Sequence, residues 1–88
     1  MPLISSFYGI LIRLYFNDDE HKHVPHFHAK YSENEAAFDF DGNLLSGSFP
    51  KKQTKFVAAW AEIHKDELNA LWDVMQTTGD YFKIKGLE

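Results

Sequence analysis

The longest segment of this chain without a glycine or a proline runs from residue 51 to residue 78. Pro50 precedes this segment and Gly79 follows it, as expected at the start and the end of a helix. At 100° per residue, the hydrophobic residues of the segment fall on one face and charged residues lie opposite. The hydrophobic face comprises Phe56, Val57, Trp60, Ile63, Leu68, Leu71 and Met75. We therefore predict one long amphipathic helix, and the pattern leaves open a kink or a split near His64–Asp66.

Four segments ahead of this helix alternate between two faces with the period of two that is typical of β-strands. They are residues 7–16, 26–31, 35–40 and 44–49. Short polar stretches separate the last three segments, and Asp41-Gly42-Asn43 is a strong turn signal. Such short connections favour an antiparallel meander. A further alternating segment, residues 81–85, leaves open an additional edge strand.

These elements predict an α+β fold in a single domain spanning residues 1–88. We expect an antiparallel sheet of three to five strands, with the long C-terminal helix packed on one face. The side chains of Phe27, Ala29 and Tyr31 are expected to face this helix. The opposite, exposed face of the sheet is then expected to carry Arg13, Tyr15, His26, His28, Lys30 and Asp39.

Composition excludes several classes of protein. Cysteine is absent, which excludes a disulfide framework, a thiolate metal site and a cysteine nucleophile. The apolar runs are far shorter than the roughly 20 residues of a membrane helix, and the N-terminus lacks the basic stretch of a signal peptide. We therefore expect a cytoplasmic protein without a membrane partner. The net charge of −4 argues against non-specific binding to nucleic acid, although protonation of all five histidines would make the charge positive.

Four histidines lie within eight residues, at His21, His23, His26 and His28. On a strand, His26 and His28 point the same way, with their side chains about 6–7 Å apart at the root. Two imidazoles at that spacing can act as an acid and a base, or share a metal ion. We interpret His26, His28 and Arg13 as candidate catalytic residues, and Lys30, Tyr15 and Asp39 as candidate substrate-binding residues. The alternative is a zinc or nickel site formed by the four histidines; otherwise we expect no cofactor.

Two further features have both a functional and a purely structural interpretation. His64 and Glu67 are neighbours on a helix surface, where such a pair can ligate a metal or tune an acid or base. We favour a core histidine that is hydrogen-bonded to a backbone carbonyl or a tyrosine hydroxyl. Arg13 lies in an otherwise apolar strand, where it can bind a phosphate or form a salt bridge with Asp39 or Glu35.

Lysines gather at the start of the expected helix, at Lys51, Lys52 and Lys55. Three cations there oppose the helix dipole, which is locally unfavourable. A bound anion would explain them, but a solvated surface is the usual explanation and the one we favour.

Several short motifs together resemble a known family. They are Ile4-Ser5-Ser6-Phe7-Tyr8-Gly9-Ile10, Tyr15-Phe16-Asn17-Asp18, Pro25-His26-Phe27-His28-Ala29, Trp60-Ala61-Glu62-Ile63-His64 and Glu67-Leu68. They resemble a small bacterial and phage family, domain of unknown function number 4160. Members usually have two prolines before the first histidine of the Pro-His-Phe-His-Ala core, whereas Val24 stands at one of these positions here. The loop Asp18–Val24 is also longer and richer in histidine than expected, so the resemblance concerns His26 and His28 rather than His21 and His23.

The resemblance implies a context rather than an activity. Members look like components of compact two-gene loci that resemble toxin–antitoxin modules, which implies a protein partner encoded by the neighbouring gene and RNA as a target. We therefore expect a module component whose histidine-centred site acts on or binds a phosphate-bearing target, and whether it is an enzyme stays open. One alternative is a non-catalytic, antitoxin-like module that binds its partner. A second alternative is a transition-metal-binding protein that uses the His21–His28 cluster. An unpaired sheet edge would also make a homodimer plausible.

Overall fold

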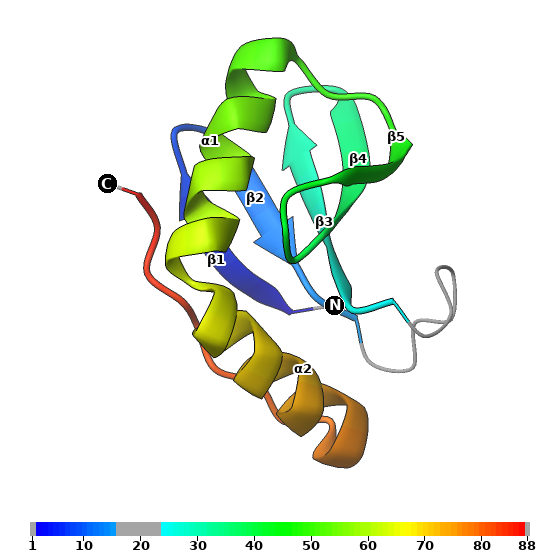
Figure 1. Ribbon diagram of the computed structural model, residues 1–88, viewed down its shortest axis with the longest axis vertical. Coiled ribbons are helices and arrows are strands. Elements are labelled where there is room, and N and C mark those ends of the chain that lie inside the picture. The colour runs from blue at the N-terminus through cyan, green and yellow to red at the C-terminus, as the bar shows by residue number, and fades with distance from the viewer. Residues whose placement is uncertain (1, 16–23, 88) are drawn as a thin grey trace.

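The computed structural model describes residues 2–15 and 24–87. Five antiparallel strands follow one another in chain order across a single sheet. They are β1 (Leu3–Phe7), β2 (Ile10–Arg13), β3 (His26–Tyr31), β4 (Asn34–Asp39) and β5 (Leu44–Gly47). Two helices follow, α1 (Lys51–Ile63) and α2 (Lys65–Thr78), and α1 crosses one face of the sheet (Figure 1). The predicted α+β class and the antiparallel meander are confirmed.

The first hairpin differs from the prediction of one strand over residues 7–16. The chain turns at Tyr8 and Gly9, and Phe7 pairs directly with Ile10. Both turn residues have positive φ, 48° for Tyr8 and 79° for Gly9, as a two-residue hairpin loop of the favoured twist requires. Tyrosine is an unusual residue for the first of these positions, so the sequence gives only a weak turn signal. The turn shifts the alternation by one residue, which buries Phe7 and exposes Tyr8.

The helix expected over residues 51–78 is two helices that meet at His64, within the region where the pattern leaves a split open; φ of His64 is −109° and ψ is 23°. A straight helix over residues 51–78 would be about 42 Å long. The longest dimension of the fold is 34 Å. The break allows α1 to pack across the sheet and α2 to continue past its end (Figure 1). Ile63 precedes the break and is 65% exposed, so its assignment to the buried helix face is wrong.

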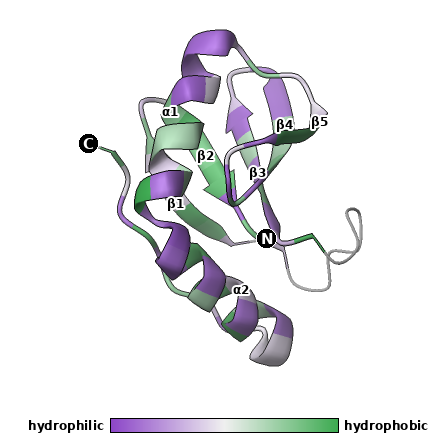
Figure 2. Ribbon diagram, in the orientation of Figure 1, coloured by the Kyte–Doolittle hydropathy of each residue, from purple (hydrophilic) through white to green (hydrophobic). Residues whose placement is uncertain are grey.

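The hydrophobic core lies between the sheet and the helices, with Phe27 near its centre. The Phe27 ring meets the ring of Trp60 edge-on, with 5.4 Å between ring centroids. It also stacks on Phe38 and Phe40. Figure 2 shows β2 in hydrophobic colours under α1. The fully buried helix residues are Val57, Trp60, Ala61, Leu68, Leu71 and Met75.

The C-terminal segment is not the edge strand that residues 81–85 suggested. It runs back along the helices toward β1, shown in red in Figure 1, and two hydrogen bonds hold it there. The Ile84 amide donates to the Ile4 carbonyl at 2.7 Å, and the Trp60 indole donates to the Lys85 carbonyl at 2.9 Å. One backbone bond to β1 is too few for a strand ladder. Among the described residues, no helix is both long enough and apolar enough to cross a membrane.

Candidate functional site

A shallow groove crosses the face of the sheet that points away from the helices. Most of its lining comes from β2, β3 and β4, whose alternate residues project on this side, and β5 adds residues at one end. The groove is lined by Leu11, Arg13, Tyr15, His28, Lys30 and Glu35, and it continues toward Ser46 and Gly47. We call it the His28 groove. Arg13 and His28 are direct neighbours in the pairing of β2 with β3, so the strand register brings these two predicted site residues together.

The ring of Tyr15 stacks on the imidazole of His28. Their centroids are 4.4 Å apart and their planes differ by 15°. Tyr15 lies just beyond the end of β2, and the Gln76 side-chain amide of α2 donates to its backbone carbonyl at 3.1 Å. A residue of α2 therefore fixes the backbone of Tyr15, although no motif of the sequence links this helix with the site.

His26 is buried, which corrects the expectation that it lies on the exposed face. Only 1% of the residue is exposed, and its ring lies 5.5 Å from that of Trp72 and 5.3 Å from that of His28. α2 contributes to this burial, because it runs past the end of the sheet and packs Trp72 against the start of β3. The Nδ1 atom of His26 lies 2.7 Å from the Val24 carbonyl oxygen. A carbonyl can only accept, so Nδ1 carries the proton and donates.

Trp72 and Gln76 are the residues that sequence reasoning missed. They are four residues apart on α2, and so they share one side of the helix. Trp72 contacts His26, and Gln76 binds the residue that stacks on His28. The spacing alone would have placed the two side chains together, but nothing in the sequence says that this side of the helix meets the end of β2 and the start of β3.

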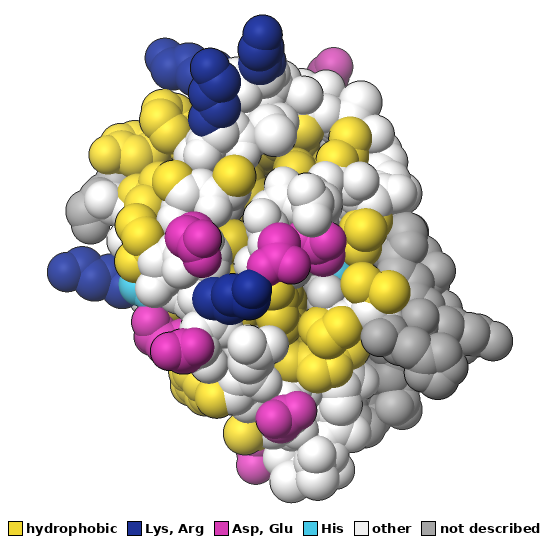
Figure 3. All heavy atoms as spheres, viewed as in Figure 1, with side chains coloured by type: hydrophobic (Ala, Val, Ile, Leu, Met, Phe, Trp, Pro, Cys, Tyr) yellow, Lys and Arg dark blue, Asp and Glu magenta, His cyan; other side chains and the backbone are white. Residues whose placement is uncertain are grey.

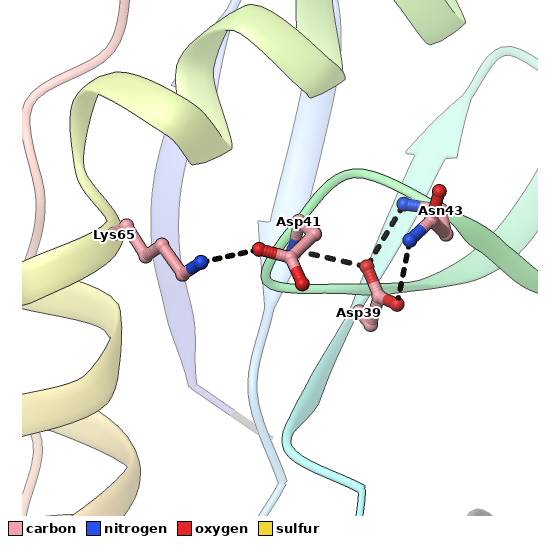
Figure 4. A network of polar contacts seen from close by, with 4 residues as sticks. All are labelled: Asp39, Asp41, Asn43 and Lys65. Atoms are coloured by element: carbon pink, nitrogen blue, oxygen red, sulfur yellow. Dashed lines mark hydrogen bonds and ion pairs between the residues drawn. The ribbon is translucent and has the colours of Figure 1, made fainter.

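Asp39 is the last residue of β4, and its carboxylate binds the turn that follows (Figure 4). Its Oδ1 atom accepts hydrogen bonds from the backbone amides of Asp41 and Asn43, both at 2.9 Å, and its Oδ2 accepts from the Asn43 side chain at 3.1 Å. Partial burial alone would raise the pKa of Asp39, but these hydrogen bonds outweigh it and hold the pKa below its ordinary value. Lys65 pairs with Asp41 and ties α2 to the same turn.

His64 and Glu67 lie at the junction of the two helices. The Nδ1 atom of His64 is 2.5 Å from a carboxylate oxygen of Glu67, and the imidazole also packs on the Trp60 ring. The spacing of three residues was therefore a correct guide to the contact. The partner is a carboxylate rather than the expected carbonyl or tyrosine hydroxyl. Their place in the fold is the helix junction, whereas the His28 groove lies on the face of the sheet that points away from the helices.

The groove carries two cations and one carboxylate. Lys30 pairs with Glu35 at 4.0 Å, and both side chains are largely exposed, so the pair adds little stability. Within residues 2–15 and 24–87, no group of three His, Asp or Glu residues is placed to hold a metal ion. His21 and His23 lie outside the described residues, so the four-histidine metal site stays a prediction.

Comparison with known families adds one finding to this geometry. The family model described as domain of unknown function (DUF4160) matches residues 9–73. The chain belongs to this family. The DUF4160 match extends from β2 into α2, and it includes Trp72 and every residue of the His28 groove. Neither the curated proteins nor the solved structures gave a match.

Proposed function

We propose that this DUF4160 chain is a component of a bacterial toxin–antitoxin-like module, and that its His28 groove binds a phosphate-bearing target, in the first instance RNA. The module follows from the resemblance and its two-gene loci. The observation that carries the binding function is the stack of Tyr15 on His28, with Arg13 next to His28 in the strand register.

The groove supplies the two kinds of contact that single-stranded nucleic acids use. Flat rings accept a stacked base, and cations bind the phosphates that link the bases. Tyr15 and His28 provide the rings, while Arg13 provides a planar fork of donors that matches a phosphate. Lys30 adds a second positive charge further along β3. The carboxylate of Glu35 lines the same groove and repels phosphate groups, so we expect the affinity for RNA to be moderate rather than high.

Burial of His26 favours binding over cleavage. Cleavage of RNA by two imidazoles requires one to take a proton from the attacking hydroxyl and the other to give one to the leaving oxygen. Both rings must therefore reach the same phosphate. His28 lines the groove, but His26 is 1% exposed and lies behind it, against Trp72. His26 is better suited to holding His28 in place than to touching a ligand.

Binding of a fluorescein-labelled RNA twelve-mer, followed by fluorescence anisotropy, tests this proposal. We expect His28→Ala and Arg13→Gln each to weaken binding by about fivefold or more, because a base stack and a phosphate contact are each worth at least about 1 kcal/mol. The control is Lys83→Gln, which removes one charge from the exposed C-terminal segment. No measurable RNA binding by the wild-type protein would overturn the proposal.

Induced expression in a bacterial host tests the module. Growth arrest by the wild type and not by His28→Ala, at matched soluble levels, would support a toxin that works through the groove. If neither protein arrests growth and the chain co-purifies with the product of the neighbouring gene, the antitoxin-like alternative takes its place. A metal bound stoichiometrically after purification without a tag would support the metal-binding alternative instead.

A further inference from the structure

A second cationic surface lies at the end of the molecule where α1 begins. Residues 42–61 contain no Asp or Glu, although the chain has a net charge of −4. The only charged residues in this stretch are Lys51, Lys52 and Lys55, and all three are exposed. Figure 3 shows Lys side chains gathered over the start of α1, with hydrophobic side chains beside them. Positive charge is therefore concentrated at the start of α1, although the protein as a whole is acidic.

An aromatic pair borders these lysines. The ring of Tyr8, at the turn between β1 and β2, packs on Phe56 of α1 with 5.0 Å between the centroids. Phe56 follows Lys55 directly and lies one helical turn after Lys52, so the ring and the Lys52 ammonium lie on one side of the helix. Tyr8 is 48% exposed. Together, Tyr8, Lys51, Lys52, Lys55 and Phe56 form what we call the tip surface.

The backbone at Tyr8 is an unfavourable place for a tyrosine. Its φ of 48° lies in the left-handed region, where a bulky side chain is a rare outlier and where hairpin turns prefer Asn, Asp or Gly. Backbone strain of this kind persists where the surrounding structure enforces it, and it clusters at functional sites. Gly9, the second residue of the turn, also has a positive φ, and glycine is the residue usually found in this conformation. The strained position holds a half-exposed ring beside the lysines.

We infer that the tip surface is a second contact site for the RNA strand, in which the lysines bind backbone phosphates and the Tyr8 ring stacks on a base. This inference rests on the proposed function of the His28 groove and extends it, because it adds a second contact for the same strand beyond the groove. An acidic protein segment would contact only the lysines, whereas an RNA strand offers phosphates to the lysines and bases to the half-exposed Tyr8 ring that packs on Phe56, so RNA matches both parts of the surface.

The path between the two sites is short. Leu11 lines the groove and lies one residue beyond Ile10, where β2 leaves the Tyr8–Gly9 turn. A strand held by His28 and Lys30 that continues past Leu11 crosses the β1–β2 turn and meets Tyr8. An oligonucleotide too short to reach beyond the groove would have no contact with the lysines.

The first test compares two double variants with the same change in net charge. Lys51→Gln/Lys52→Gln alters the tip surface, and Lys83→Gln/Lys85→Gln removes two exposed lysines from the C-terminal segment. Anisotropy is measured with fluorescein-labelled U12 and U4 at several salt concentrations. We expect the tip variant to bind U12 at least about fivefold more weakly and with a log–log salt slope shallower by about 1.4, since each single-strand phosphate contact contributes about 0.7. U4 affinity should be equal for the two variants.

These outcomes separate the two proposals. If the wild type binds neither oligonucleotide, the proposed function fails. If the wild type binds U12 through His28 but the two double variants behave alike, the groove stands and the tip surface is overturned. If a labelled polyglutamate peptide binds and loses affinity in the tip variant while U12 does not, the surface takes an acidic protein segment and the RNA assignment is overturned.

The second test separates a binding role of Tyr8 from a folding role. Tyr8→Gly places the residue that tolerates positive φ at the strained position and removes the ring. We expect the midpoint of urea unfolding to stay within about 0.5 M of the wild type, because relief of strain offsets the lost contact with Phe56. U12 affinity is expected to fall at least about fivefold. Unchanged affinity in this folded variant would overturn the role of the ring.

Discussion

The Tyr15 ring lies 4.4 Å from the His28 imidazole in a nearly parallel stack, while the His26 ring meets the same imidazole edge-on at 5.3 Å. His28 thus contacts two rings, and both of the residues that carry them contact α2. The Gln76 amide binds the Tyr15 carbonyl, and Trp72 packs on His26. The most exposed imidazole of the site therefore depends on contacts made beyond the sheet.

Replacing Tyr15 tests whether the stack itself contributes to binding. Tyr15→Phe keeps the ring over His28, so we expect RNA affinity within about twofold of the wild type. Tyr15→Leu keeps an apolar side chain but removes the π-face, and we expect a loss of about fivefold or more. Anisotropy with U12 measures both. Equal affinities for the two variants would mean that stacking plays no part.

The two histidines of β3 should differ in their effect on stability. His26→Ala leaves a cavity beneath Trp72 and should lower the free energy of unfolding by about 2–3 kcal/mol. His28→Ala acts in an open groove and should cost less than about 1 kcal/mol. Urea unfolding followed by circular dichroism measures both values. An equal loss in the two variants would show that His26 is not packed as described. Because His28→Ala is expected to stay folded, it is the variant to use in growth-arrest experiments.

Asp39 should give stability a defined pH dependence. The pKa of its carboxyl is held below the ordinary value of 3.8 by the turn hydrogen bonds, so the unfolded state binds the proton more readily. The stabilisation is therefore present above about pH 4 and is lost as the pH falls through the lower folded-state pKa. We expect Asp39→Asn to be about 1 kcal/mol less stable than the wild type at pH 7 and nearly equal to it at the lowest pH. Urea unfolding at pH 2.5, 4 and 7 checks this, and a gap that does not narrow in acid would contradict it.

Trp60 should hold the C-terminal segment in place. Trp60→Phe keeps the aromatic packing but removes the indole donor to the Lys85 carbonyl, so we expect a loss of about 1–2 kcal/mol. Hydrogen exchange at the Ile84 amide, which is bonded to the Ile4 carbonyl, should accelerate more than exchange in β3. Equal acceleration at both places would indicate general destabilisation rather than release of the segment.

The bounds of the helices and strands were easiest to predict where the residues at their ends are those usually found in turns and caps. The strand over residues 26–31 was predicted with the bounds that the structure has, because Pro25 precedes it and a polar turn follows it. The end of the helix at Gly79 was equally clear, and the residue has the left-handed φ of 80° that favours glycine. The turn at Tyr8 was missed because the residue found there is one that such turns disfavour.

Burial of His26 could not be predicted from strand periodicity. Alternation assigns side chains to the two faces of a sheet, but it says nothing about the ends of the strands. His26 is the first residue of β3, and the side chain that packs against it comes from Trp72, far away in the sequence. The helix pattern predicted that Lys51 to Thr78 would be helical, but the break at His64 decides where Trp72 lies.

The break at His64 also makes the chain sensitive to a change in length at that point. One extra residue added here in helical conformation would turn every later side chain of α2 by about 100° and shift it by about 1.5 Å. Trp72 would then lose its contact with His26, and Gln76 would at the same time lose its hydrogen bond to Tyr15. Most junctions between elements accept insertions. The length of this junction, however, decides which side of α2 faces the sheet, and that side carries the two residues that contact His26 and Tyr15. Descendants of this sequence should vary in the residues that form this junction far more readily than in their number.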